Sequence, residues 1–477
     1  MGSLRESPYL WARGFMIAPE GRYQPPAGFC SVAVQGWTLS TESRTQVSSM
    51  AAADGRFVVV IGYVLDVRAV HDDVDLIVRT LLDALGISEA AFFAYLDQLG
   101  GRYAVFYGDR NRASILGDAC ATRTIFYART EPLIASHHAL VAEACGAGRS
   151  DHWQARQADR RRHTTYGYPA GTTPDRNVGL LLGNMVLRLD SMTYERYYPR
   201  RDLPSLSIED AAATLAVYFH NQLDVLVRRY RIVCSLTAGL DSRATLAALR
   251  PYLDGCRFFT YRTSDDHEID AVLAALIARR HRLAHGLMPT PDTASDGFAR
   301  FKKILRRNNY HPHGTAAAYG YLSLFQPGDI HLRSNLYEIA RAFHRSRREW
   351  TEELDARGMA ALYFREFSDQ DHDLVDAFSD YVETSEFATG LWNYDPYDVF
   401  YLEQRMSCWH ALVLLEADPS VDTYLLMNAR CCLEVGLAVP RTERIAASVF
   451  TTMMADLWPE LLELPINPKR LSAIPAE

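Results

Sequence analysis

Long apolar runs are missing from this chain of 477 residues. No segment approaches the ~18–20 consecutive apolar residues that a membrane-spanning helix needs. The first residues, MGSLRESPYLWARGF, also contain no apolar stretch of the kind that directs secretion. We therefore expect a cytoplasmic protein that does not enter a membrane.

Cysteine pairs with metal-binding spacing are missing too. The eight cysteines are scattered, none forms a CxxC pair, and Cys431 and Cys432 are adjacent within a predicted helix. Thiols of this kind stay reduced in the cytoplasm. The pattern excludes a zinc framework and argues against a disulfide between the two neighbours.

The sequence also lacks an excess of positive charge. The net charge is −8 and the isoelectric point is about 6.0, whereas a protein that grips a phosphate backbone is usually basic. This argues against nucleic acid as the partner. With 48% apolar and 23% charged residues, the composition is that of a globular protein. The length allows two or three domains.

The first ~150 residues are rich in predicted strands. Arg56–Asp66 reads as a buried strand, Gly100–Asp109 and Arg112–Asp118 as a hairpin, and "TIFYA" and "PLIAS" as a second hairpin. Helical patterns at Val74–Ala84 and at "ISEAAFFAYLDQL" interrupt the strands. The mixture predicts an α+β domain.

A polar, turn-rich stretch from Gly146 to Leu203 follows, and we place a domain boundary near its end, at residue 200. Beyond it, strands and helices alternate: a long amphipathic helix at Ile208–Arg229, the strand RIVCSL, a helix from Ser242, the strand CRFFTYRT and the helix HEIDAVLAALIARRH. Such alternation predicts a doubly wound parallel sheet. The last third of the chain is mostly helical.

One strand-to-helix turn, "SLTAGLDSR", carries a chemical signal. Free N–H groups at a helix start suit a phosphate, Gly239 permits a sharp bend, and Thr237 and Ser242 add hydroxyls. Asp241 suits Mg²⁺ that bridges phosphate oxygens. The alternative is a plain turn with Asp or Ser as the helix cap. The spacing and the lysine of a Walker A loop are absent. The residues predicted to bind ATP and pyrophosphate are Ser235, Thr237, Ala238, Gly239, Leu240, Asp241, Ser242 and Arg243.

The segment LTAGLDS (Leu236–Ser242) resembles the pyrophosphate-binding loop of the N-type ATP pyrophosphatases, Ser-Gly-Gly-x-Asp-Ser. Thr237 stands at the usual Ser and Ala238 at the first Gly, whereas Gly239, Asp241 and Ser242 match. This superfamily includes tRNA-modifying thiolases, lysidine synthetases, argininosuccinate synthetases and the asparagine synthetase group.

Three other segments favour the last group. Leu96–Ala128 resembles part of an Ntn-type glutaminase domain, Leu180–Tyr198 resembles the connection that follows it, and Tyr401–Pro440 resembles the helical end of asparagine synthetases. The resemblance implies an α+β Ntn-hydrolase-like domain over residues 1–200. It further implies an α/β adenine-nucleotide α-hydrolase-like (PP-loop) domain over residues 201–477, with a helical C-terminal end.

The glutaminase pattern is broken at its nucleophile. A glutaminase of this type uses an N-terminal cysteine with a free α-amine, but the chain begins Met1-Gly2-Ser3, and Cys30 is internal. We expect no glutamine hydrolysis. β-Lactam synthetases, which are similar, also carry a glutaminase-like domain without that cysteine.

A second metal and pyrophosphate element of the family, Gly-x-Gly-x-Asp-Glu, is matched best by Arg333–Phe343. Glu338 falls on the Glu, and Tyr337 falls on the metal-binding Asp. We expect either that Glu338 joins Asp241 as a Mg²⁺ ligand or that Arg333 and Arg341 neutralise the pyrophosphate instead. The alternative is a buried Glu–Arg pair on a helix, three residues apart.

Weaker candidates lie elsewhere. Lys469 is placed where the family has a lysine that contacts phosphates and the adenylate, and the alternative is a solvated tail lysine. His267–Asp270 suits either the ribose or metal, or a helix N-terminus. The spacing of Tyr401 and Glu403 favours core packing over a Tyr–Glu base.

The resemblance implies ATP-dependent amide formation with ATP and Mg²⁺ as cofactors. A carboxylate of a small molecule or peptide attacks the α-phosphorus, pyrophosphate leaves, and an amine displaces AMP. Because glutamine is not the source, three sources of nitrogen stay open: an amine of the same molecule, as in β-lactam synthetases and macrolactam cyclases, an amine of a second molecule, and free ammonia. The analogy implies a role in natural-product or peptide biosynthesis. A homodimer is one further expectation. The alternatives are a catalytically silent ATP-binding or scaffold homologue and a PP-loop enzyme that modifies RNA.

Overall fold

The computed structural model describes residues 7–109, 111–146, 148, 167–262, 268–347, 351–364, 366–368 and 370–474. The first three residues, on which the missing nucleophile was predicted, and His267 lie outside these ranges. Across the described residues, no helix combines the length and apolar character needed to cross a membrane. All eight cysteines are free, as predicted.

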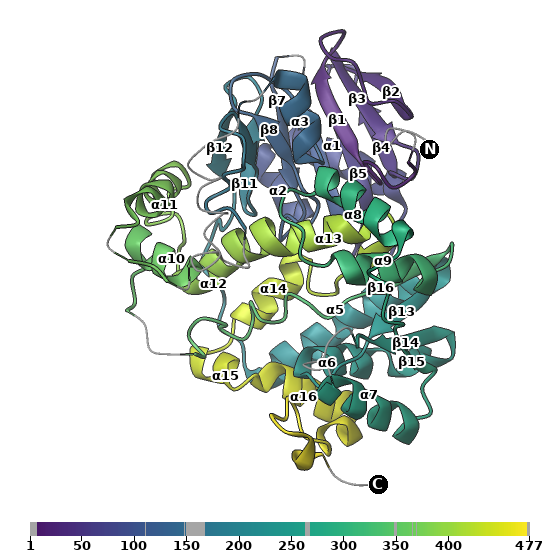
Figure 1. Ribbon diagram of the computed structural model, residues 1–477. Coiled ribbons are helices and arrows are strands. Elements are labelled where there is room, and N and C mark those ends of the chain that lie inside the picture. Colours follow the sequence, from purple (N-terminus) through teal and green to yellow (C-terminus); the bar gives the residue numbers. More distant parts are fainter. Residues whose placement is uncertain are drawn as a thin grey trace.

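Two six-stranded antiparallel sheets form the N-terminal half (Figure 1). The first has the order β10-β8-β9-β1-β3-β2 and the second the order β12-β11-β7-β6-β5-β4. The strands are β1 (Phe15–Pro19), β2 (Phe29–Val34), β3 (Trp37–Glu42), β4 (Val47–Ala51), β5 (Phe57–Asp66), β6 (Leu99–Gly108), β7 (Ala113–Gly117), β8 (Phe126–Ala128), β9 (Ile134–Ala135), β10 (Val178–Leu180), β11 (Met185–Arg188) and β12 (Thr193–Arg196).

The two sheets share one core, in which the ring of Trp37 from β3 lies 5.6 Å from that of Phe106 from β6. Helices α1 (Val74–Ile87) and α2 (Glu89–Leu96) pack beside the second sheet, and α3 (His138–Cys145) packs on the first. Every residue of β5 is buried, which explains its unbroken apolar run. Both predicted hairpins are confirmed, since β6 pairs with β7 and β8 with β9.

A five-stranded sheet of order β15-β14-β13-β16-β17 lies in the second half, and all its pairs are parallel. The predicted parallel sheet is therefore confirmed. Its strands are β13 (Arg231–Ser235), β14 (Cys256–Thr260), β15 (His285–Leu287), β16 (Asp329–Leu332) and β17 (Asp422–Tyr424). The chain runs from β13 outward to β15 on one side and through β16 to β17 on the other, so the order reverses at β13.

Helices cover both faces of this sheet and fill the C-terminal third (Figure 1). They are α5 (Ile208–Arg229), α6 (Leu240–Ala248), α7 (Glu268–Arg280), α8 (Asp296–Asn308), α9 (Thr315–Leu324), α10 (Ala356–Tyr363), α11 (His372–Thr384), α12 (Pro396–Phe400), the π-helix Tyr401–His410, α13 (Ala411–Ala417), α14 (Arg430–Leu437), α15 (Arg441–Ile445) and α16 (Ser448–Leu457), with 3₁₀ turns at Arg250–Gly255, Pro459–Leu462 and Leu471–Ala473. Helix α5 has the predicted ends, because Ser207 caps its first turn and Arg228 and Arg229 favour its last.

The core of the N-terminal sheets continues into the C-terminal half. Buried side chains between Leu354 and Leu415 belong to the same apolar cluster as the two sheets, and Figure 1 shows α10–α12 beside the sandwich. A buried ion pair between Arg102 and Asp418 also joins the halves, with Nη2 lying 3.0 Å from Oδ2. The boundary near residue 200 stays a prediction, and a cut there would divide this core.

Candidate functional site

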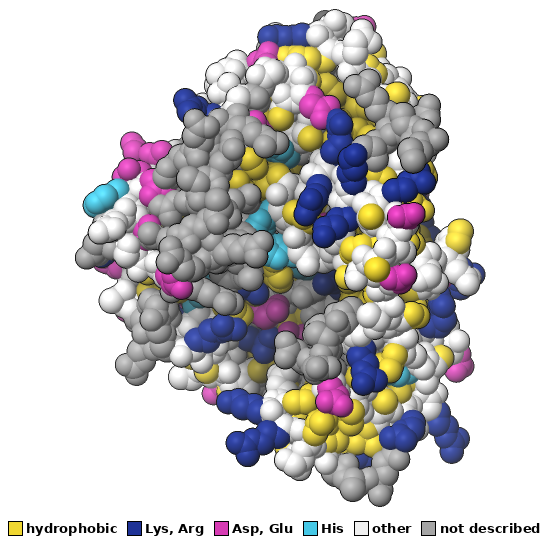
Figure 2. Space-filling model, in the orientation of Figure 1, with side chains coloured by type: hydrophobic (Ala, Val, Ile, Leu, Met, Phe, Trp, Pro, Cys, Tyr) yellow, Lys and Arg dark blue, Asp and Glu magenta, His cyan; other side chains and the backbone are white. Residues whose placement is uncertain are grey.

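The loop Ser235–Arg243, hereafter the nucleotide loop, lies at the point where the strand order reverses. Strand β13 ends at Ser235, and α6 begins at Leu240 with Gly239 as its cap residue. Strand β16, the neighbour of β13 on the other side, leads into residues 333–347. In open parallel sheets this reversal opens a crevice at the carboxyl ends of the strands, where ligands bind. Figure 2 shows a recess near the middle of the molecule, with acidic and basic side chains at its margin.

The hydroxyl groups of the nucleotide loop hold the turn in shape. The backbone N–H of Thr237 donates to Oγ of Ser242 at 3.2 Å, and the two hydroxyls lie 3.0 Å apart. The N–H of Gly239 donates to Oγ1 of Thr237 at 3.1 Å. These bonds fix the shape of the turn, and its hydroxyls are placed beside the N–H groups that suit a phosphate.

Asp270 is a residue whose role the sequence left open. It lies in the first turn of α7, and its Oδ1 accepts the backbone N–H of Ala238 at 2.7 Å. The carboxylate therefore orients the nucleotide loop from a neighbouring helix. Only the acid at a predicted helix start hinted at this contact in the sequence.

Arg243 is fully buried and does not face the crevice. Its guanidinium donates to the carbonyl oxygens of Leu461 at 3.1 Å, Leu464 at 2.8 Å and Ala238 at 3.3 Å. It ties the C-terminal segment to the nucleotide loop. Four other residues predicted to bind ATP are also buried, namely Ser235, Ala238, Leu240 and Ser242.

Asp241 interacts with two of the three charged residues predicted from the second element, Glu338 and Arg341. Its Oδ2 lies 2.8 Å from Nη2 of Arg341. Burial and then the nearby carboxylate of Glu338 raise the pKa of Asp241 to about 7, although the charge and hydrogen bond of Arg341 oppose the shift. Oδ1 of Asp241 and Oε2 of Glu338 are buried and have no hydrogen-bond partner among the described residues. Two carboxylates thus share a place where only one guanidinium balances their charge.

Residues 336–347 form successive turns, so the alternative of a Glu–Arg pair on a helix is wrong. Tyr337, which the alignment placed at the metal-binding Asp, is fully buried instead. Its hydroxyl lies 2.7 Å from Oγ1 of Thr245 in α6. This contact fixes the turns against α6 and leaves Glu338 as the acid of the segment that faces Asp241.

The pair Asp241 and Glu338 fits a divalent cation that also binds phosphate. Mg²⁺ is commonly held by one or two carboxylates, with substrate phosphates and waters as its other ligands. Two buried carboxylate oxygens without partners meet this requirement. No group of three or more His, Cys, Asp or Glu side chains suited to a metal exists in the described part of the chain. These residues therefore fit Mg²⁺ that arrives with a nucleotide.

Lys469 has an exposed side chain, but its segment touches the nucleotide loop. The N–H of Asn467 donates to the carbonyl oxygen of Ala238 at 3.0 Å. The lysine lies two residues further on in the chain. This position suits a contact with phosphate and leaves the role of the lysine a prediction.

Glu403 and Tyr401 are packed in the core, as predicted. Glu403 is buried and accepts Nη2 of Arg196 at 3.0 Å, so that the π-helix is joined to β12. The ring of Tyr401 packs on that of Phe343 at 4.4 Å.

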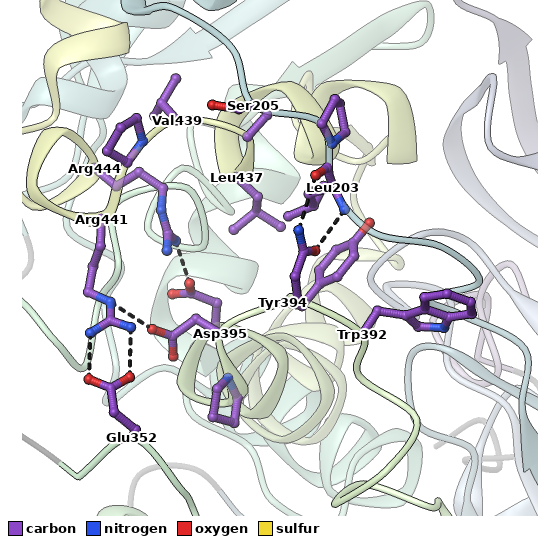
Figure 3. Close-up of a pocket in the computed structure, with 16 residues that line it drawn as sticks. Leu203, Ser205, Glu352, Trp392, Tyr394, Asp395, Leu437, Val439, Arg441 and Arg444 are labelled. Carbon is purple, nitrogen blue, oxygen red and sulfur yellow. Dashed lines mark hydrogen bonds and ion pairs between the residues drawn. The ribbon is translucent and has the colours of Figure 1, made fainter.

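An ion-pair network anchors the far end of the turns 336–347, and Figure 3 shows the part of it that Arg441 forms with Asp395 and Glu352. Nε of Arg345 lies 3.1 Å from Oδ2 of Asp395, which also accepts Nε of Arg441 at 3.1 Å. Arg441 forms two further bonds to Glu352, of 3.0 and 2.9 Å. The network borders a pocket of about 480 Å³ between the loop 392–398 and the start of α15. The described charges of this network are already paired with one another. We therefore interpret the network as a structural support for the turns 336–347.

No protein-family model matches the chain, and no curated protein matches it significantly. Weak likenesses to solved structures include the following three. A glutamine-dependent NAD+ synthetase from Acinetobacter baumannii, in complex with ADP, shares 16% identity over 36% of this chain and 33% of that one, with a TM-score of 0.22. A glutamine phosphoribosylpyrophosphate amidotransferase from B. subtilis, complexed with ADP and GMP, shares 8% identity over 71% and 72%, with a TM-score of 0.25. An allosteric regulatory enzyme of purine biosynthesis shares 9% identity over 72% and 73%, with a TM-score of 0.26.

The chain thus spans about a third of the length of the NAD+ synthetase. Superpositions this poor carry no weight for fold or function. The geometry of the nucleotide loop and of Asp241, Glu338 and Arg341 has to support a function by itself.

Proposed function

We propose that this protein forms an amide bond at the expense of ATP, through adenylation of a carboxylate. An Ntn-like sandwich followed by a PP-loop domain, as in the asparagine synthetase group, is part of the proposal. The observation that carries it is the meeting of Asp241, Glu338 and Arg341 at the reversal point of the parallel sheet. This is where an α/β sheet binds ligands, and the three charges suit a nucleotide that brings its own cation.

In this proposal each residue of the site has its own role in binding or catalysis. The N–H groups at the start of α6 bind the phosphates, with Thr237 and Ser242 keeping the turn in shape. Asp241 and Glu338 would hold Mg²⁺, which supplies charge neutralisation at the phosphate oxygens when it is bound. Arg341 stabilises the negative charge that develops on pyrophosphate as the substrate carboxylate attacks the α-phosphorus. Lys469 reaches the adenylate from the C-terminal segment.

The amine in this proposal does not come from glutamine. Cys30 lies within β2, opposite Thr41 of β3, so its nitrogen belongs to a peptide bond. A cut before Cys30 would release β1, which lies between β9 and β3 in the sheet. The nucleophile is then an amine of the same molecule or of a second one, as in β-lactam synthetases and macrolactam cyclases.

The test is exchange of labelled pyrophosphate into ATP, measured over a panel of amino acids, peptides and other carboxylic acids. Exchange that requires one acid and is lost in Asp241→Asn would support adenylation and name the electrophile. Arg228→Gln, a substitution at the exposed end of α5, is the control for effects of mutation and purification that do not involve the site. Without exchange for any acid, and without a rise in melting temperature on addition of ATP and Mg²⁺, the protein would be a silent homologue.

A further inference from the structure

Helix α8 is a basic element on the surface of a chain whose net charge is −8. One face of the helix is apolar, and Phe298, Phe301 and Leu305 are buried there. The rest of its surface holds cations. The four cations that are exposed, hereafter the basic face, are Arg300, Lys302, Lys303 and Arg306. Figure 2 shows Lys and Arg side chains gathered over α8, above the recess near the middle of the molecule.

The basic face has no acid opposite it. None of its four side chains forms an ion pair with a carboxylate of the described residues. The fifth cation of the helix differs, because Arg307 pairs with Glu143 of α3 and lies over the ring of Trp11 at 5.5 Å. The fold therefore neutralises the cation that faces the N-terminal sandwich and leaves the other four to solvent.

The charges of the basic face repel one another. Residues three and four apart are neighbours on a helix surface. Lys303 therefore lies beside both Arg300 and Arg306, and Lys302 lies beside Arg306 too. Only Arg306 and Arg307 stand in the last turn, where the helix dipole favours a cation. The stability of α8 therefore does not explain the charge pattern, since three of the four exposed cations lower it.

The opposite side of α8 is fixed to the N-terminal half of the chain. The carboxamide of Asn308 donates to the carbonyl oxygen of Tyr9 at 2.8 Å and accepts the N–H of Trp11 at 3.1 Å. The ring of Phe301 lies 5.6 Å from that of Tyr9. The basic face is thus presented on a rigid support, so a partner that binds it has little backbone of this protein to order.

We infer that the basic face of α8 docks an acidic segment of another protein. Charge complementarity identifies the chemistry of the partner, because four cations without counter-ions suit carboxylates. The four cations lie within ~9 Å along the helix axis, which matches about two turns of an acidic helix. Docking requires neither ATP nor the nucleotide loop, so the inference does not depend on the proposed function.

Nucleic acid fits this face less well. A strand of nucleic acid would extend beyond α8 over a chain of net charge −8, which repels its phosphates. Lysine also lacks the planar fork with which arginine binds a phosphate. Lys302 and Lys303 are two of the three lysines of the chain, which otherwise uses arginine. The composition of the face therefore favours carboxylates.

The first experiment measures binding of a fluorescein-labelled helical peptide, with glutamates along one face, to the whole chain by fluorescence anisotropy. We expect binding that weakens as salt is raised from about 0.05 to 0.5 M. Lys302→Glu with Lys303→Glu should reduce the affinity roughly 10- to 100-fold. Arg79→Glu with Arg282→Glu reverses two exposed charges, on α1 and after α7, and is the matched control. It should change the affinity less than about threefold.

Melting temperatures show whether the loss comes from docking or from folding. Each new glutamate lies four residues before an arginine, Arg306 or Arg307, an arrangement that stabilises a helix. We therefore expect the Lys302→Glu, Lys303→Glu variant to melt no lower than the wild type while it loses the peptide. An unchanged affinity in this variant, or an equal loss in the control variant, would overturn the inference. So would tighter binding of single-stranded RNA or of phosphatidylserine vesicles than of the peptide.

A second experiment locates the contact. Carbodiimide couples lysine amines directly to the carboxylates of the same peptide, and the chain has lysine only at positions 302, 303 and 469. Lys469 is exposed as well, so it is an internal control. We expect mass spectrometry to find the peptide on Lys302 and Lys303. Peptide on Lys469 alone would contradict docking at α8.

Discussion

Nη2 of Arg341 lies 2.8 Å from Oδ2 of Asp241, although 100 positions separate the two residues in the chain. Each follows a strand of the parallel sheet, and β13 and β16 are neighbours there. The pair joins the nucleotide loop to the turns that carry Glu338. The guanidinium of Arg341 therefore neutralises negative charge at the candidate site whether or not a metal ion is bound.

Arg341→Met should lower acid-dependent pyrophosphate exchange roughly 100- to 1000-fold, because it removes a donor aimed at charge that develops during the reaction. Arg341→Lys should recover part of the loss, since it restores the charge but not the planar fork. Initial rates at saturating ATP measure both. If Arg341→Met exchanges as fast as the wild type, the arginine has no part in the chemistry.

Asp270→Ala should raise the KM for ATP roughly tenfold. The change leaves the N–H of Ala238 without its acceptor at 2.7 Å, and a hydrogen bond to a charged group contributes about 1.5–3 kcal/mol. Glu268→Ala, an exposed acid in the same first turn of α7, is the matched control. A KM that shifts equally in both variants would point to the charge of the helix end and not to the loop.

Asp418→Ala should reduce the free energy of unfolding by about 3–5 kcal/mol, since Arg102 is left buried and unpaired. Replacing both residues, as in Arg102→Met with Asp418→Leu, should restore most of the loss. Urea denaturation measures the three variants. A double variant no more stable than Asp418→Ala would mean that packing around residue 418, and not the stranded charge, is responsible.

Glu416 gives a prediction on pH. Burial raises its pKa from 4.5 to about 7, although three N–H donors oppose the shift. Because the folded pKa is the higher one, the stabilisation that this group gives is complete below pH 4.5 and is lost as the pH rises to 7.

The unfolding free energy of the wild type, measured against Glu416→Gln, should therefore fall by up to about 3 kcal/mol between pH 4.5 and pH 7. Denaturant titrations at pH 5, 6, 7 and 8 measure it, with the exposed Glu209→Gln as the control. A difference between wild type and Glu416→Gln that is constant with pH would contradict the shift.

Most of what could be predicted from the sequence came from patterns within short stretches of the chain. The strand β13, its turn and α6 follow from a run of β-branched residues, a glycine and a helix former, and α5 is marked at both ends by its capping residues. Strand β17 has three residues and exists because it pairs with β16, so no periodicity reveals it.

The parts of the candidate site that lie within one stretch of sequence could be predicted. The contacts between segments that are distant in the sequence could not. The nucleotide loop is one stretch of sequence, and the match of Arg333–Phe343 to the second element of the family pointed to Glu338, whose charge acts on Asp241 in the structure. That alignment also placed Tyr337 at a metal, whereas it lies in the core beside Thr245. The contact of Asp270 with Ala238 depends on how α7 packs beside β13, which no spacing encodes.

The core that the N-terminal sheets share with α10–α13 has a consequence for synthesis of the protein. The strands up to Arg196 leave the ribosome more than 150 residues ahead of Leu354, where the part of that core from the second half begins. At ~5–20 residues per second, the nascent sandwich waits roughly 8–30 s with an apolar face uncovered. During that interval the growing chain is a natural client for a chaperone at the ribosome exit.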